Sequence, residues 1–130
     1  MKLIKKCVLF SVGGTAYFLL ELLWRGRSYG SMFLLGGTCF LLIGEGNRRL
    51  IRLPLPVRLA ASAAAVTVLE LLTGLLVNRD HRVWDYRQMP YNYLGQICLP
   101  YSLLWLPVSF MAMGLYTAAA NAVEKMAADA

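Results

Sequence analysis

The chain has 130 residues, of which 58% are hydrophobic and only 15% are charged, and its mean hydropathy is +0.55. This composition lies outside the usual range of water-soluble domains and is typical of a membrane protein. The formal net charge is +6, but the basic residues lie between apolar segments and form no basic stripe with interleaved aromatic side chains, which argues against nucleic-acid binding and for contact with lipid headgroups.

Four apolar segments approach the length of about 20 residues that a membrane-spanning helix needs. They cover about residues 6–24, 29–43, 57–77 and 94–119. The sequence therefore predicts an all-α, polytopic membrane protein, a four-transmembrane-helix bundle in which residues 1–130 form a single integral membrane domain.

The first segment follows Lys2, Lys5 and Lys6, in the layout of a signal peptide. No small-x-small cleavage site comes after it, and the stretch from Glu21 to Arg25 continues the helical pattern, so we expect an uncleaved first span. The second segment is short and rich in glycine. It is expected to pack tightly against a neighbour, or to cross the membrane incompletely, and to end at residues 44–47.

Prolines mark the later boundaries. Pro54 and Pro56 lie in a basic connection and stop a helix from running through it into the third segment. Pro100 and Pro107 predict a kink or two half-helices in the fourth segment. One face of that segment carries side chains that we expect to be packing residues, namely Tyr101, Trp105, Ser109 and Tyr116.

The distribution of basic residues predicts the orientation. If both termini lie on one side of the membrane, that side carries eight Lys and Arg residues and the other carries five. The positive-inside rule then places both termini in the cytoplasm of a multi-pass protein of the cell membrane. Glu21 and Glu70 consequently fall in the outer part of the membrane.

A short pattern recurs in the two halves of the chain. Residues 20–23 and 69–72 both read LELL, and Tyr-x-x-Met and Gly-x-x-Cys follow each copy in the same order, beginning at Tyr29 and Gly36 and at Tyr86 and Gly95. A tandem repeat of two spans would place Glu21 and Glu70 face to face. Chance identity in a leucine-rich sequence is the alternative.

Glu21 and Glu70 are the main candidate functional residues, because a charge within the hydrocarbon costs at least about 2.5 kcal/mol and needs a partner or a function. Arg25 follows Glu21 by one helical turn. Glu70 has no basic residue three or four positions away, so its partner must come from another helix, a loop or a ligand. The two carboxylates either line a cavity that binds a cation or proton, or make structural contacts within the bundle. In the first case, nearby arginines neutralise the carboxylates or hold an anion, namely Arg25, Arg27, Arg79, Arg82 or Arg87.

The loop before the fourth segment is rich in aromatic and polar residues. Its aromatic residues predict a belt at the headgroup level or a pocket that closes over a ligand. In the second interpretation, the ligand-binding residues beside the two glutamates and Arg25 are Asp85, Tyr86, Asn92 and Gln96. No recognised metal-ligand spacing occurs, and the three cysteines show no CxxC pattern, so neither a metal nor a cofactor is expected.

The run Trp84–Leu99, with Leu-Glu70-Leu-Leu and Glu21-x-x-Trp24 upstream, resembles the small bacterial membrane proteins called putative ABC-transporter type IV, or CmpB-like, permeases. Their signature W-D-Y-x-x-x-P-x-N-x-x-G-Q-I is matched here at Trp84, Asp85, Tyr86, Pro90, Asn92, Gly95 and Gln96. The resemblance implies a role in transport. The chain has no Walker A motif, so nucleotide-driven transport would need a separate ATPase. One copy of four short spans encloses little volume, which makes a homo-oligomer the expectation.

These observations lead to one leading hypothesis and two alternatives. The leading hypothesis is a permease-like protein that binds or translocates a small solute or ion through an outward-facing polar site. The first alternative is a structural or regulatory membrane subunit that transports nothing. The second is an enzyme acting on lipid headgroups, which would need His81, Asp85 or Glu70 as general base, although no catalytic motif occurs in the sequence.

Overall fold

The computed structural model describes residues 2–26, 30–81 and 84–129. Within these ranges the chain forms four helices and a two-stranded antiparallel hairpin, which confirms the all-α class. The elements, in chain order, are α1 (Lys2–Arg25), α2 (Gly30–Arg49), α3 (Leu55–Val77), β1 (Asn92–Tyr93), β2 (Ile97–Cys98) and α4 (Leu99–Asp129).

Three of these helices are long and apolar enough to cross a membrane: Leu3–Leu23 within α1, and the whole of α3 and α4. By length and composition α2 is not among them, because its last turns carry Glu45, Asn47, Arg48 and Arg49. Its 20 residues nevertheless make a helix about 30 Å long. The described part of the chain thus contains three apolar candidate spans and one more polar helix.

The helices differ from the predicted segments at several boundaries, since α1 begins at Lys2, α2 ends at Arg49, and α4 runs from Leu99 to Asp129. Helix α2 continues through residues 44–47 to Arg49, because Gly44 lies directly against the ring of Tyr116 on α4 and this packing outweighs the low helix propensity of glycine. Helix α4 begins at Leu99 instead of Leu94. Positive φ angles at Tyr91, Leu94 and Gly95 turn the preceding residues into the hairpin.

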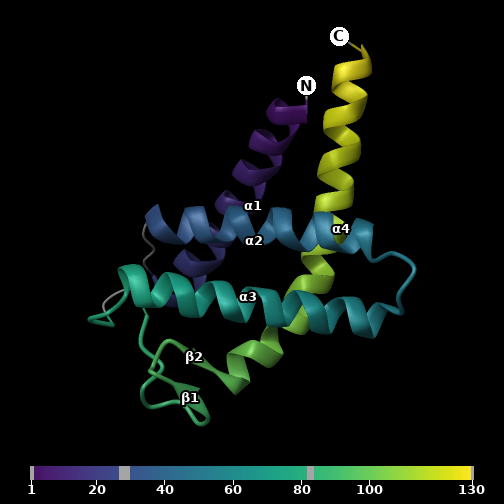
Figure 1. The fold of residues 1–130 in the computed structure, drawn as a ribbon. Coiled ribbons are helices and arrows are strands. Elements are labelled where there is room, and N and C mark those ends of the chain that lie inside the picture. Colours follow the sequence, from purple (N-terminus) through teal and green to yellow (C-terminus); the bar gives the residue numbers. More distant parts are fainter. Residues whose placement is uncertain (1, 27–29, 82–83, 130) are drawn as a thin grey trace.

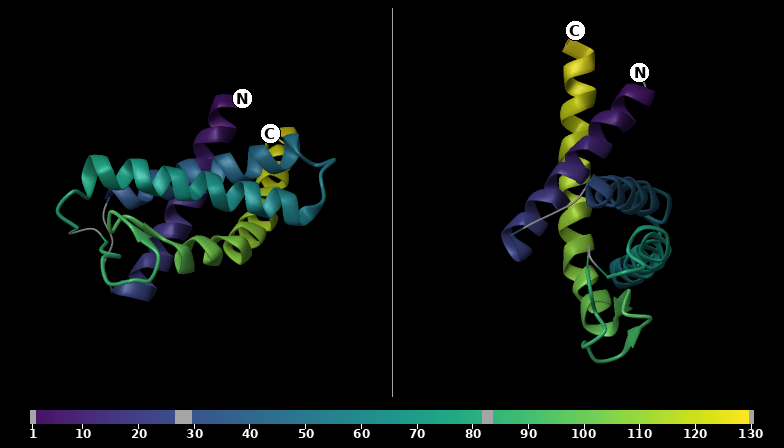
Figure 2. Two further views of the ribbon diagram at one scale, coloured as in Figure 1. Left: turned by 60° about the horizontal axis from the view of Figure 1, so that its bottom comes forward. Right: turned by 90° about the vertical axis from the view of Figure 1, so that its left-hand side faces the viewer.

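The helices α2 and α3 lie side by side and antiparallel, and α1 and α4 cross them steeply (Figures 1 and 2). Both termini lie at one end of the molecule, where Lys5 on α1 forms an ion pair with Glu124 on α4. The end of α1, the start of α2 and the β-hairpin lie away from the termini. Helix α4 bends in its first half, where Pro107 removes a main-chain hydrogen-bond donor.

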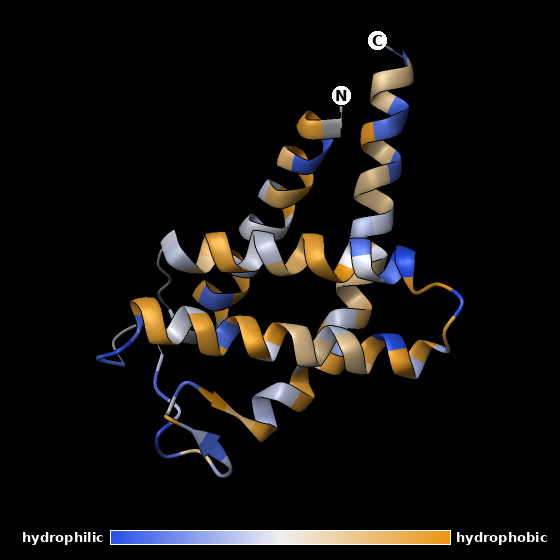
Figure 3. Cartoon of the chain, in the orientation of Figure 1, coloured by the Kyte–Doolittle hydropathy of each residue, from blue (hydrophilic) through white to orange (hydrophobic). Residues whose placement is uncertain are grey.

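Polar residues gather at the ends of this arrangement. Figure 3 shows them in the loop around the hairpin, at the C-terminal end of α2 and in the last turns of α4, whereas the middle of the helices is mostly apolar. Large apolar side chains are exposed in the middle of these helices, among them Val68, Phe110 and Met111. Such an apolar middle with polar ends matches the profile of a lipid bilayer.

Close contact of backbone and aromatic side chains holds α1 against α2. A Cβ atom added to any of four glycines on these helices would lie less than 3 Å from a residue of the other helix. The pairs are Gly13 with Phe40, Gly14 with Phe33, Gly36 with Tyr17 and Gly37 with Phe10. Only glycine permits this approach, so the tight packing predicted for the glycine-rich second segment is present.

The two halves of the chain differ locally where the recurring pattern was noted. Both LELL segments are helical, and they lie within α1 and α3. Gly36 and Cys39 lie in α2, whereas Gly95 and Cys98 lie in the turn and second strand of the hairpin. Tyr29 lies outside the described residues. The likeness in local structure is therefore limited to the segments that carry the glutamates.

Candidate functional site

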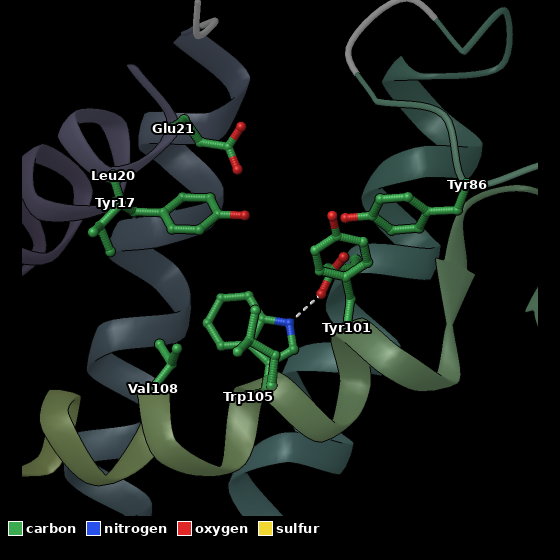
Figure 4. Close-up of a pocket in the computed structure, with 9 residues that line it drawn as sticks. Tyr17, Leu20, Glu21, Tyr86, Tyr101, Trp105 and Val108 are labelled. Atoms are coloured by element: carbon green, nitrogen blue, oxygen red, sulfur yellow. Dashed lines mark hydrogen bonds between the residues drawn. The ribbon is translucent and has the colours of Figure 1, made fainter. Parts of the chain in front are cut away.

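A cavity of about 250 Å³ lies between α1, α3, α4 and the loop that precedes the hairpin. Both candidate glutamates line it, Glu21 from α1 and Glu70 from α3, although α1 and α3 are not consecutive helices. The described residues that line it are Tyr17, Leu20, Glu21, Glu70, Tyr86, Tyr101, Leu104, Trp105 and Val108 (Figure 4). The cavity thus combines two carboxyl groups with four aromatic rings.

Helical spacing explains how α1 and α4 supply most of this lining. Tyr17, Leu20 and Glu21 are three and four positions apart and therefore share one face of α1. On α4 the same spacing aligns Tyr101, Leu104, Trp105 and Val108. Each helix consequently presents a mixed aromatic and apolar stripe to the cavity.

Glu70 is a buried carboxyl group, with 5% of the residue exposed. The indole Nε1–H of Trp105 on α4 donates a hydrogen bond to its Oε1 atom (Figure 4). Glu70 thus has a partner on another helix. The sequence predicted a partner from outside α3, because no basic residue lies three or four positions from Glu70. The hydrogen bond also holds the Trp105 ring at the wall of the cavity.

The aromatic residues form two pairs at the cavity. The ring centroids of Tyr17 and Trp105 are 5.8 Å apart with an interplanar angle of 35°. Those of Tyr86 and Tyr101 are 4.9 Å apart and stacked at 13°. Figure 4 shows the hydroxyl groups of Tyr17 and Tyr86 entering the same space from opposite walls. Aromatic faces and hydroxyl groups are thus available on both sides of the carboxylates.

A buried hydrogen-bond network fastens the loop to the end of α3 and so positions Tyr86. Its centre is the fully buried Asn78, whose Nδ2 donates to the main-chain carbonyl of Trp84 (2.6 Å) and to Oε1 of Gln96 (2.9 Å). Gln96 Nε2 donates in return to the carbonyl of Asn78 (2.9 Å), and the indole N–H of Trp84 donates to the carbonyl of Gln96 (2.7 Å). Each of these three residues is less than 4% exposed. The loss of one hydrogen bond would therefore leave another buried polar group without a partner.

The structure brings together only some of the residues predicted for the site. Glu21, Glu70 and Tyr86 line the cavity, whereas Gln96 belongs to the network around Asn78. Asn92 lies in the hairpin, where its Nδ2 donates to the carbonyl of Met89 (2.9 Å) and its Oδ1 accepts from the N–H of Gly95 (3.1 Å).

Of the two remaining predicted site residues, one lies elsewhere and the other has a side chain outside the described part of the structure. Asp85 forms an ion pair with Arg87 (2.7 Å) and does not line the cavity. Arg25 is the last residue of α1, and its side chain lies outside the described part of the structure.

Sequence reasoning missed other residues that matter at the site. Tyr101 and Trp105 were expected only to pack, but both line the cavity. Their helical spacing could have indicated this role. Tyrosine and tryptophan side chains on one helix face carry O–H and N–H groups that can donate hydrogen bonds to a buried carboxyl group. Asn78 was missed as well. The signal for it is an amide placed directly after an apolar helix, where main-chain groups need partners.

The Asp85 carboxylate has a defined electrostatic environment. Hydrogen bonds from the side chain and the main-chain N–H of Arg87 lower its pKa from the ordinary value of 3.8 to about 2. Because the folded-state pKa is lowered, the interaction stabilises the loop fully above pH 3.8 and is lost as the pH falls through about 2.

We expect an NMR titration to give a pKa of about 2 for the Asp85 carboxyl group. In Arg87→Gln this pKa should lie nearer to its ordinary value. An unchanged midpoint in the variant would contradict this assignment.

Metal ligation finds no support in the part of the chain that the structure describes. No group of three or more His, Cys, Asp and Glu side chains there could hold a metal ion. Cys39 and Cys98 are buried free thiols. The chemistry available in the cavity is therefore that of carboxyl groups, phenols and an indole.

Comparison with known proteins gives a family match. A family model described as putative ABC-transporter type IV matches residues 7–129, which is nearly the whole chain. No curated protein and no solved structure matches the chain.

Proposed function

Since this chain belongs to the putative ABC-transporter type IV family, we propose that it is a permease-like membrane protein that binds or moves a small cation through the cavity between Glu21 and Glu70. The observation that carries the proposal is that these two acids, from separate helices, line one cavity. Acidic side chains within a membrane are expensive to bury, and they commonly mark ion and solute pathways.

The sign of the charge follows from the lining. Among the described lining residues, two have carboxyl groups and none is a lysine, arginine or histidine. Electrostatic interactions are stronger in such a largely apolar site than in bulk water, because the effective dielectric constant is lower there. A cation or a proton is therefore favoured there, and an anion is repelled.

We propose further that all four helices cross the membrane, with both termini in the cytoplasm. Helices α2 and α3 are 20 and 23 residues long, run antiparallel and are joined by residues 50–54 (Figure 1), which supports a pair of crossings in opposite directions. The termini share one end. In this topology the cavity lies toward the outer side, beneath the loop and hairpin. The matching LELL segments both contribute a glutamate to the cavity, which supports a duplicated unit of two spans, whereas the Gly-x-x-Cys segments differ in local structure.

The proposed complex contains more than one chain. A cavity of about 250 Å³ in one copy is small against the lower end of about 300 Å³ for typical ligand pockets. A homo-oligomer would combine several such cavities or build a path between copies. Because the sequence carries no Walker A motif, a nucleotide-driven mechanism would depend on a separate ATPase subunit.

One observation favours a second candidate, the structural or regulatory subunit. Glu70 accepts a hydrogen bond from Trp105, and such a bond between helices can serve to hold a bundle together. On this view the glutamates stabilise the fold and have no ligand. Thermal stability and ligand binding of the same variants separate the two candidates.

The test is calorimetric titration of the purified protein in lipid nanodiscs with K⁺, Ca²⁺, benzyltrimethylammonium and the anion benzenesulfonate. We expect at least one cation to bind, the anion to fail, and Glu70→Gln to weaken cation binding at least about tenfold, since the attraction between opposite charges is lost. Glutamine can still accept the Trp105 hydrogen bond, so the fold should persist.

Glu124→Gln is the matched control, because Glu124 lies outside the cavity, paired with Lys5 at the other end of the molecule. It should bind cations as the unmodified protein does. If no probe cation binds, and Glu70→Gln only lowers the unfolding temperature, the structural subunit is the correct interpretation and the permease proposal is wrong.

A further inference from the structure

We infer that the ligand of this cavity is a substituted ammonium cation, held between the two aromatic pairs with its positive charge near the carboxylates. The inference rests on the proposed cation-binding function and specifies the chemical class of the cation. It depends on the size of the cavity, on the composition of its walls and on the placement of the rings.

The size of the cavity argues against a bare inorganic ion. Its volume of about 250 Å³ equals that of roughly eight water molecules at about 30 Å³ each. A bound Ca²⁺ needs six to eight oxygen ligands at about 2.3–2.6 Å, whereas the described lining offers two carboxyl groups and three phenols, which are divided among α1, α3, α4 and the loop. An ion bound at one wall would leave most of the cavity unfilled.

The composition of the walls favours a cation that carries apolar groups. Leu20, Leu104 and Val108 contribute aliphatic surface, and the rings contribute the remainder outside the two glutamates. A strongly hydrated ion that entered the cavity would lose water ligands, and apolar walls offer few polar groups to replace them. Alkyl or aryl substituents on a nitrogen cation would instead be buried favourably.

The four aromatic residues that line the cavity can attract such a charge. A cation within about 6 Å of an aromatic face is attracted by the ring quadrupole, most strongly by tryptophan. Tyr17 and Trp105 form one pair at 5.8 Å, and Tyr86 and Tyr101 form the other at 4.9 Å. The bond from the Trp105 indole to Glu70 fixes a ring and a carboxylate side by side. A quaternary or tertiary ammonium group would contact both at once.

Variants of Trp105 separate the contribution of its ring from that of its hydrogen bond. Trp105→Leu removes both the aromatic ring and the N–H that bonds to Glu70, whereas Trp105→Phe removes the N–H but keeps a smaller aromatic ring. We expect Trp105→Leu to weaken benzyltrimethylammonium binding by about 3- to 30-fold and Trp105→Phe to weaken it less. Phe110→Leu is the control, because Phe110 is an exposed aromatic residue of the same helix and does not line the cavity.

The titrations also compare ligands, and the outcomes differ for the two proposals. Benzyltrimethylammonium should bind more tightly than K⁺ or Ca²⁺, and excess K⁺ should compete weakly. If K⁺ or Ca²⁺ binds in a Glu70-dependent way but the ammonium probe does not, the inference is overturned and the cation-binding function stands. Equal ammonium affinity in Trp105→Leu and Trp105→Phe would also overturn it. If no cation binds at all, both proposals fail.

Discussion

Replacement of Asn78 by leucine is expected to lower the free energy of unfolding by about 3 kcal/mol, because the change removes the centre of a buried network. Asn78 is fully buried and bonds to the carbonyl of Trp84 and to the side chain of Gln96, while its Oδ1 accepts from the N–H of Trp84 (3.2 Å). Leucine has a similar size but leaves these groups without partners. Stranding each such group costs about 1–3 kcal/mol.

The effect should be visible in the loop as well as in global stability. Hydrogen exchange of residues 84–98 should become faster, since the network fastens this segment to the end of α3. Tyr86 lies in the same segment and lines the cavity, so cation affinity should fall with it. Chemical denaturation in detergent micelles and exchange mass spectrometry measure the two effects.

Asn121→Leu provides the comparison for the Asn78 variant, because Asn121 is exposed on α4. Exposed substitutions usually change stability by less than about 0.5 kcal/mol. A loss no larger in Asn78→Leu than in Asn121→Leu would show that the loop is held by other contacts.

The second large effect is expected at the α1–α2 interface, where Gly36→Val should cost about 3 kcal/mol or more through overpacking. A Cβ atom on Gly36 would lie 2.5 Å from the Cβ of Tyr17, which is far inside the contact distance of two carbon atoms. The two branched methyl groups of valine add further volume. Because the Tyr17 atom is close to its own backbone, it cannot move aside without a shift of α1.

Displacement of α1 would also alter the site, since Tyr17 and Glu21 both line the cavity. We expect Gly36→Val to weaken cation binding together with stability. Gly46→Val is the matched control, because Gly46 lies in the same helix with nothing within 4 Å of an added Cβ. It makes the same change in helix propensity without the clash. Equal stability of the two variants in a denaturant titration would refute the close-packing explanation.

Several features of the site could be predicted from the amino-acid sequence. Hydropathy predicted the membrane class, and acids within apolar segments identified Glu21 and Glu70, which line one cavity. The sequence did not predict the roles of Gln96 and Asn92, which bond within the loop and hairpin. A polar side chain can bind a ligand or a main-chain group equally well, and only the neighbours brought by folding decide between them.

Local properties of the chain determined that these segments are apolar helices and which side chains share a face, because hydropathy and the helical repeat act over neighbouring residues. The Tyr17–Glu21 face of α1 and the Tyr101–Val108 face of α4 are of this kind. Only the tertiary structure decided that the two faces enclose a cavity with Glu70. The reason is that the crossing of α1 and α4 over α2 and α3 depends on contacts between distant residues, such as Gly36 with Tyr17 and Gly44 with Tyr116.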